Sequence, residues 1–166
     1  MKKAILLLFP ILVLIGIFYY VQVANKSATE IENIKKVPLK IKDNTIQDPQ
    51  CHMFIVGQNY TVQIITADNK THFFDDPGCA VLWAESNKIN LDSSVIWFYT
   101  VDTKKWKKLK DVYFSISDAT PMHYGFGAYE HKKSSFIDFK DMRLRMLRGE
   151  NMTNPKIRKK ILSELK

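Results

Sequence analysis

Short stretches in which apolar and polar residues alternate predict four strands in the first half of the folded region. Each stretch is rich in β-branched or aromatic residues and is bounded by turn residues such as Gly57-Gln58-Asn59. The predicted strands are residues 54–56, 60–66, 71–74 and 95–101, and the first two form a hairpin. Between the last two strands, Pro77 opens a segment to Asn87 whose apolar residues recur at helical spacing.

The second half repeats this rhythm with shorter strands. The predicted strands are residues 106–109, 111–116 and 124–129, and a predicted helix runs from Ser134 to Arg148. The fold class that follows is α+β, with two ββαβ-like halves. The tail, residues 152–166, ends in an amphipathic basic segment that predicts a further helix.

The N-terminal apolar segment predicts a membrane anchor. Residues 4–24 carry no charge and would span about 31 Å as a helix, which matches the roughly 30 Å hydrocarbon core of a bilayer. A cleaved signal peptide is the alternative, but the apolar run exceeds the usual length, and Gln22 breaks the small-x-small pattern before Ala24. We therefore expect residues 1–24 to be an uncleaved transmembrane helix.

The remaining chain divides by composition into a tether, a folded domain and the tail. Residues 25–47 are polar and predict a tether, within which Ser27 and Glu30 match the capping box of a short helix over residues 27–36. Residues 48–151 hold all three tryptophans, and their length suits a single core.

The formal net charge of +8 raises nucleic acid as a partner. No zinc-knuckle spacing, RNA-recognition signature or Gly-rich phosphate loop accompanies that charge. The excess lies in basic clusters at residues 104–110 and 158–160, which we interpret as solvated faces, with adhesion of the tail to anionic lipid as the alternative. Nucleic acid is therefore not an expected partner.

The pattern that points to chemistry is Cys51-His52-Met53. Thiolate and thioether sulfur select Cu(I) over harder divalent ions. If residues 51–53 are extended, Cys51 and Met53 leave the same face about 6.6 Å apart at Cα, and Met122 would supply a third soft donor. The pattern alone is weak, because methionines often fill cores. Cys51 and Cys79, the two cysteines, are also candidates for a disulfide in an oxidising compartment.

Several motifs follow one another in a fixed order. They are DPQCHM at residues 48–53, FFDDPGC at 73–79 with Trp83, VDT at 101–103 with Trp106, and TPMHYGFGA at 120–128. Together they resemble the NosL family, which comprises accessory proteins of nitrous oxide reductase, over residues 48 to about 145. The resemblance implies a periplasmic Cu(I) chaperone built from paired ββαβ halves, distantly similar to the organomercurial lyase fold.

The resemblance also implies a ligand set. The Cys-x-Met pair of the family falls on Cys51 and Met53, and its downstream methionine falls on Met122. Two features depart from the family pattern. Many members are lipoproteins, whereas this chain has an apolar anchor and no lipidation cysteine, and the residue between Cys and Met is commonly Gly, whereas here it is His52.

Further residues near these motifs are secondary candidates for ligands. His52 and His123 each adjoin a proposed sulfur ligand, but adjacent strand residues face opposite sides. Cys79 is interpreted as a structural residue at the start of a helix. Asp75 and Asp76 are interpreted as stabilising the N-terminus of that helix rather than as a hard-metal site or a general base.

We therefore expect a membrane-anchored, periplasmic Cu(I) carrier without enzymatic activity. It would lie in the inner membrane as a single-pass protein with its folded domain facing the periplasm. Its expected partners are nitrous oxide reductase and the membrane-bound complex that assembles the copper centres of that enzyme. The alternatives are a metal-free scaffold for the same machinery and a thiol-dependent, lyase-like enzyme with Cys51 as nucleophile.

Overall fold

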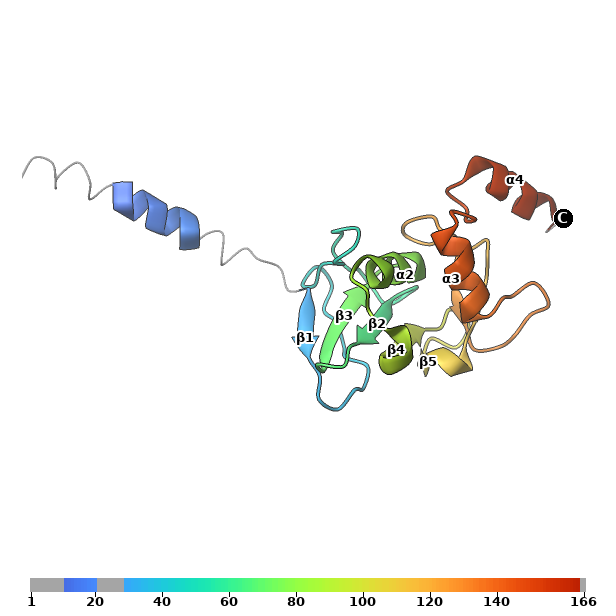
Figure 1. Ribbon diagram of the computed structural model, residues 1–166, viewed down its shortest axis with the longest axis horizontal. Coiled ribbons are helices and arrows are strands. Elements are labelled where there is room, and N and C mark those ends of the chain that lie inside the picture. The colour runs from blue at the N-terminus through green and yellow to red at the C-terminus, as the bar shows by residue number, and fades with distance from the viewer. Residues whose placement is uncertain (1–10, 21–28, 165–166) are drawn as a thin grey trace, which may run out of the picture.

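A five-stranded antiparallel sheet forms the centre of the folded domain (Figure 1). The computed structural model describes residues 11–20 and 29–164. In spatial order the strands are β1 (Glu30–Glu32), β3 (Lys70–Phe74), β2 (Val62–Ile65), β4 (Val95–Tyr99) and β5 (Trp106–Lys108). β2 is buried along its whole length, so both faces of the sheet are covered.

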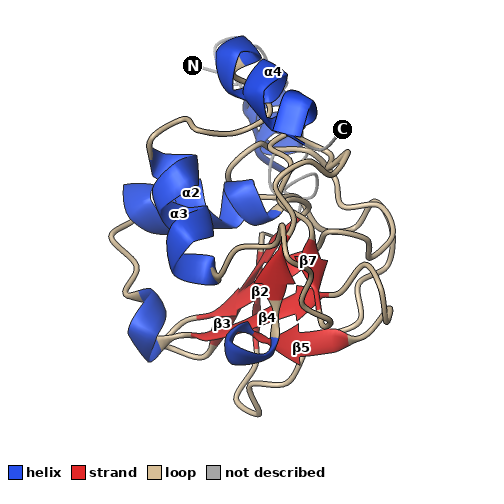
Figure 2. Cartoon of the chain, turned by 90° about the vertical axis from the view of Figure 1, so that its right-hand side faces the viewer, coloured by secondary structure: helices blue, strands red, loops and turns tan. Residues whose placement is uncertain are grey.

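Two helices cover one face of the sheet. Helices α2 (Pro77–Ser86) and α3 (Phe139–Leu147) lie side by side there (Figures 1 and 2). The main core combines alternate residues of the strands with one side of each helix, and its fully buried members include Ile64, Phe74, Phe98, Val81 and Met142. This arrangement confirms the predicted α+β class and, within it, the predicted helix at residues 77–87.

The chain before β2 covers the opposite face of the sheet. The buried side chain of Gln63 bonds to both the N–H and the C=O of Leu39, each at 2.8 Å. Nearby, Ile46, Ile55 and Phe73 form a second small core. Much of the stretch that was predicted to be a tether therefore packs on the sheet, because it supplies the apolar cover that this face needs.

Two predictions in this region are wrong. Residues 27–36 do not form a helix over their described part, because Glu30–Glu32 pairs with β3 as an edge strand. Residues 54–56 do not form a hairpin with residues 60–66, since Phe54 makes only an isolated bridge to Gln47. β2 pairs instead with β3 and β4, which places it inside the sheet with all four of its residues buried.

The two halves of the chain differ in topology. β2, β3, α2 and β4 follow the predicted ββαβ order. In the second half, β6 (Tyr113–Phe114) and β7 (Ala128–Tyr129) form a separate two-stranded sheet, and no strand follows α3 up to residue 164. The prediction of two ββαβ-like halves therefore fails for the second half, because residues 115–127 form a long loop instead of extending the strands.

The first and last described helical segments lie outside the sheet. Residues 11–20 are helical, and the rest of the predicted anchor, residues 1–10 and 21–24, lies outside the described residues. Within the described ranges, no helix has both the length and the apolar character that crossing a bilayer requires. The predicted tail helix is present as α4 (Pro155–Glu164), which packs through Ile161 and leaves its basic residues exposed.

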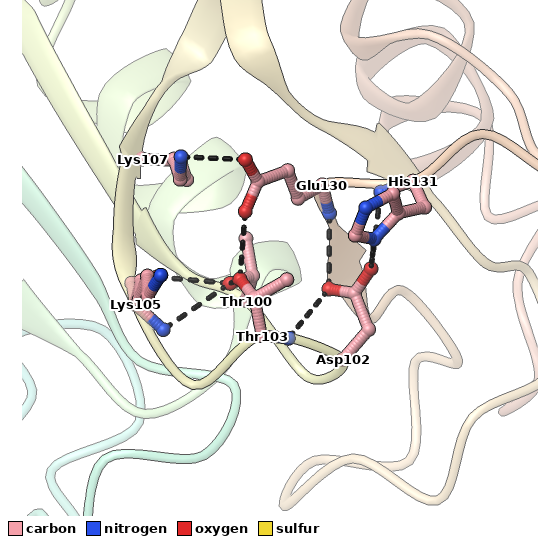
Figure 3. A network of polar contacts seen from close by, with 7 residues as sticks. All are labelled: Thr100, Asp102, Thr103, Lys105, Lys107, Glu130 and His131. Atoms are coloured by element: carbon pink, nitrogen blue, oxygen red, sulfur yellow. Dashed lines mark hydrogen bonds and ion pairs between the residues drawn. The ribbon is translucent and has the colours of Figure 1, made fainter.

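A polar cluster fastens the turn between β4 and β5 to the end of β7 (Figure 3). Asp102 accepts the N–H groups of Thr103, Glu130 and His131, each at 3.0 Å, and its Oδ2 lies 2.8 Å from His131 Nδ1. Glu130 bonds in turn to Thr103 Oγ1 and Lys107 Nζ. Although partial burial opposes it, hydrogen bonding by Glu130 and His131 lowers the pKa of Asp102 to about 2. The VDT motif is thus explained by structure.

Candidate metal site

Asp48 shapes the loop that carries the Cys-His-Met pattern. Its Oδ1 accepts the N–H groups of Gln50 at 2.7 Å and Cys51 at 3.2 Å, as in an Asx turn. Two backbone bonds of 2.9 Å, from Asp48 N–H to Met53 O and from His52 N–H to Asp48 O, close the loop. His52 adopts a left-handed conformation with φ of 63°. Residues 51–53 are therefore not extended, and the predicted same-face geometry is wrong.

The start of α2 supplies the other half of the site. Asp76 is the N-cap residue, and its Oδ1 accepts the N–H of Gly78 at 2.8 Å, which confirms its interpretation as a helix-start residue. Cys79 lies in the first turn and is fully buried. Asp75 has a different position, because its N–H donates to Asp48 Oδ2 at 3.1 Å. The Asp48 side chain thus joins the loop to the end of β3.

This junction brings four potential ligands together. One ligand atom each of Asp48, Cys51, Asp75 and Cys79 lies within 4.8 Å of all the others. Cys51 Sγ lies 3.6 Å from Asp75 Oδ1, and both cysteines are free thiols. These four side chains form a group that could hold a metal ion. Cys79, a secondary candidate in the sequence, is brought to Cys51, whereas Asp48 and Asp75 were not predicted as ligands.

The electrostatics of this group favour a bound cation. Burial, reinforced by the charges of Asp48 and Asp75, raises the pKa of Cys51 to about 11. Burial, together with the charges of Asp48 and Asp76, also raises the pKa of Cys79. Burial and the hydrogen bond with Asp48 raise the pKa of Asp75 to about 7. A cation placed among these groups would oppose all three shifts.

Asp75 also has an unsatisfied atom. Asp75 is only 5% exposed, and the Oδ2 atom of its carboxyl group is buried without a hydrogen-bond partner. Among the described residues, no Lys, Arg or His forms an ion pair with Asp48, Asp75 or Asp76. An unpaired buried carboxyl oxygen is costly. A metal ion at this position would supply the missing partner.

The loop that carries Met122 is attached to the same helix start. Asp76 Oδ2 accepts the N–H of Met122 at 3.1 Å. The ring of Tyr124 packs directly on Gly78, where any side chain would collide with it. Met122 is partly buried and packs against the same core cluster as Cys51. The structure thus places the Met122 backbone next to the acidic pair at the start of α2.

The remaining predicted ligands lie at the surface. Met53 is 43% exposed, and His52 and His123 are exposed as well. His123 shares the left-handed conformation of His52, with φ of 58°. The ligand roles of Met53 and Met122 stay predictions.

Local sequence signals for the two additional acids exist. Asp48 precedes Pro49, a combination typical of a turn in which the carboxylate accepts backbone N–H groups. Asp75 and Asp76 both precede Pro77, yet a helix has a single N-cap position, so one of the two acids was free for another role. Which residues meet the free acid depends on long-range folding, and the sequence does not show it.

In comparisons with known proteins, no protein-family model, no curated protein and no solved structure matches this chain. The resemblance to the NosL family therefore rests on the ordered motifs.

Proposed function

We propose that this protein is a Cu(I) carrier that holds the ion at the Cys51–Cys79 pair and passes it to another protein. The observation that carries the proposal is the junction of two free thiols with the carboxyls of Asp48 and Asp75, all within 4.8 Å. Two thiolates suit a soft monovalent ion, which accepts low coordination numbers. The nearby carboxyls would stabilise the positive charge.

The two thiols differ in access, and this difference supports a carrier over a closed storage site. Cys79 is fully buried, whereas Cys51 is only partly buried on a surface loop. An acceptor thiolate or imidazole would therefore reach the ion from the Cys51 side. Met53, on the loop of Cys51, and Met122, whose N–H is bonded by Asp76, are candidate thioether donors, and such weak donors would allow ligand exchange.

The motifs suggest the biological setting of this carrier. Their resemblance to the NosL family supports delivery of copper to nitrous oxide reductase through its membrane-bound assembly complex. The apolar run of residues 4–24 supports a single-pass anchor in the inner membrane, with the folded domain in the periplasm. In this proposal the protein has no enzymatic activity of its own.

An anaerobic titration of the purified protein tests the metal assignment. Competition with a Cu(I) chelator should reveal one tight Cu(I) equivalent per chain, which is lost in the Cys51→Ser/Cys79→Ser double variant. Zn(II) should not displace Cu(I). Tighter binding of Zn(II) would identify a zinc site, since zinc accepts the carboxylates as ligands. Absence of any metal binding would favour the metal-free scaffold.

A cellular experiment tests the delivery role. Deletion of the gene should leave nitrous oxide reductase produced but deficient in copper, while other copper enzymes stay loaded. The wild-type chain should restore the copper content, and the double cysteine variant should not. Full copper loading of the reductase by the double variant would refute delivery through this site.

A second candidate, a lyase-like enzyme, gains support from one contact. A carboxyl group with a pKa of about 7 lies 3.6 Å from a thiol and close to a second one. In such an enzyme, the two sulfur atoms would bind the mercury of an organomercury compound. The protonated Asp75 carboxyl would give its proton to the carbon as the carbon–mercury bond breaks, and the mercury would stay on the two sulfur atoms. Incubation with phenylmercury and excess thiol distinguishes the candidates, because a carrier should release no benzene above the level of Cys51→Ser.

A further inference from the structure

An open pocket of about 480 Å³ lies beside the loop that carries Met122. Three of its lining residues, Met122, His123 and Met152, have sulfur or imidazole donors. Its lining also includes Asp118 and Arg158, whose formal charges offset each other. Cys51 and Cys79 are not among the lining residues, so this pocket is distinct from the buried cysteine cluster.

The backbone explains how two adjacent residues reach one pocket. Neighbouring side chains on an extended strand point to opposite sides. Here His123 has φ of 58°, and its N–H donates to Thr120 O at 2.9 Å within a turn. The N–H of the preceding residue, Met122, is fixed by Asp76 at 3.1 Å. The turn therefore removes the alternation, and both side chains line the same cavity.

Met152 is held against this loop from the segment between α3 and α4. Its N–H donates to Tyr124 O at 3.1 Å. Gly125 has φ of 96°, and a Cβ at that position would lie 2.6 Å from Met152 Cγ. Only glycine permits both this conformation and this close approach. The contact positions the Met152 side chain beside the loop of Met122 and His123.

We propose that Met122, Met152 and His123 form a second, outer binding site for Cu(I). Two thioethers and an imidazole are neutral donors that suit a soft monovalent ion and give a weaker site than thiolates. Met122 also packs against the core cluster that Cys51 contacts, and its N–H is bonded by Asp76, the residue that follows Asp75 of the cysteine group. We assign the outer site to the path by which copper enters or leaves the buried cysteines, and this assignment rests on the proposed carrier function.

Titration of the full-length Cys51→Ser/Cys79→Ser variant tests the outer site by itself. The probes are Cu(I) under anaerobic conditions and Ag(I), which has the same preference for soft ligands but does not change oxidation state. We expect one weaker equivalent to remain, with sulfur and nitrogen neighbours in X-ray absorption spectra. Adding Met152→Leu should weaken it at least tenfold, whereas Met142→Leu, a buried control of the same chemistry, should not.

Two results would overturn the outer site. One is that the double cysteine variant binds neither ion. The other is that Met152→Leu and Met142→Leu bind equally well while circular dichroism shows both folded. In the wild-type background, Met152→Leu should keep the tight equivalent but slow its transfer to a chelator, and an unchanged transfer rate would refute the path. If the wild-type chain binds only the weak equivalent, the cysteine site alone is refuted.

Discussion

Two clusters in this protein are organised by aspartates, one around the exposed Asp102 and one around the buried Asp75, and the pKa values of these two carboxyls shift in opposite directions. At the turn after β4, Asp102 accepts three backbone N–H groups and contacts His131, and its pKa falls to about 2 (Figure 3). At the start of α2, Asp75 faces other acids and a thiol, retains an unpartnered oxygen, and its pKa rises to about 7.

The difference separates a carboxylate that stabilises the fold from one that costs stability. The donors around Asp102 satisfy its negative charge, so this cluster is complete without any ligand. Around Asp75, burial and the charges of Asp48 and Asp76 oppose the same negative charge, so the pKa of this carboxyl is raised. Groups held in an unfavourable state are typical of functional sites. The comparison therefore indicates that the functional site lies at the start of α2 and not at the Asp102 cluster.

The group of Asp48, Cys51, Asp75 and Cys79 is here called the incomplete cluster, because Asp75 Oδ2 has no hydrogen-bond partner in it. The largest expected effect tests whether its two cysteines contribute equally to Cu(I) binding. Cys51→Ser and Cys79→Ser should each weaken Cu(I) binding by more than the roughly 10–100-fold that changes outside the ligand set cause. Asp102→Asn should leave Cu(I) affinity unchanged. Chelator competition measures all three.

A marked asymmetry between the two cysteine variants would change the ligand assignment. If Cys79→Ser binds Cu(I) as well as wild type, Cys79 is structural, as the sequence first suggested, and Cys51 acts with the methionines. If Asp102→Asn loses affinity, the separation of the two clusters fails.

Asp75→Asn should stabilise the apo protein at neutral pH while weakening metal binding. The folded pKa of about 7 lies above the ordinary 3.8, so the contribution of Asp75 to stability is present below pH 4 and is lost as pH rises to 7. Asparagine resembles the protonated form and removes this loss, which is on the order of a few kcal/mol. Urea unfolding of the apo protein from pH 4 to 8 measures it.

The control for that prediction is Asp92→Asn, which alters an exposed acid. It should leave both the pH profile and Cu(I) affinity as in wild type. If Asp75→Asn unfolds more easily than wild type at pH 7, the carboxylate is stabilised by a partner, and the account of the incomplete cluster is wrong.

Local signals predicted the elements on which the site is built. Helix α2 begins at Pro77 with an N-cap acid, and both features are visible within a few residues of sequence. The strands at residues 71–74 and 95–101 were found from their composition. β1 was missed because all three of its residues are exposed, so it has no apolar pattern and is held by backbone pairing with β3.

The site itself was only half predictable. Cys51 was found because a soft-ligand pattern surrounds it. Asp75 and Cys79 follow Cys51 in the sequence by 24 or more positions. They lie close to Cys51 because the Asp48 side chain bonds both to the loop of Cys51 and to the residue after β3. Residue type indicated the chemistry, whereas long-range folding selected the partners.

Asp102→Asn should affect stability with the opposite pH dependence to Asp75→Asn. The folded pKa of about 2 lies below 3.8, so the contribution of Asp102 is present above pH 4 and is lost as pH falls toward 2. We expect the variant to lose about 1 kcal/mol at pH 7, since water screens part of the interaction. Acid unfolding of wild type and variant measures it. Equal stability at pH 7 and pH 3 for both would show that the cluster in Figure 3 contributes nothing.

The smallest effect concerns Met122, which lies next to the incomplete cluster but is attached to it through its backbone. Asp76 binds the Met122 N–H, and substitution of the side chain leaves that bond in place, so Met122→Ala should stay folded. A thioether is a weak donor beside two thiolates, so the equilibrium affinity for Cu(I) should fall only several-fold. The rate of release to a chelator should change more than the affinity. Stopped-flow transfer measures the rate, and thermal unfolding checks the fold. If Met122→Ala unfolds, the side chain is a core residue. If both the affinity and the release rate match wild type, Met122 is no ligand, and the two cysteines with their acids hold the ion without it.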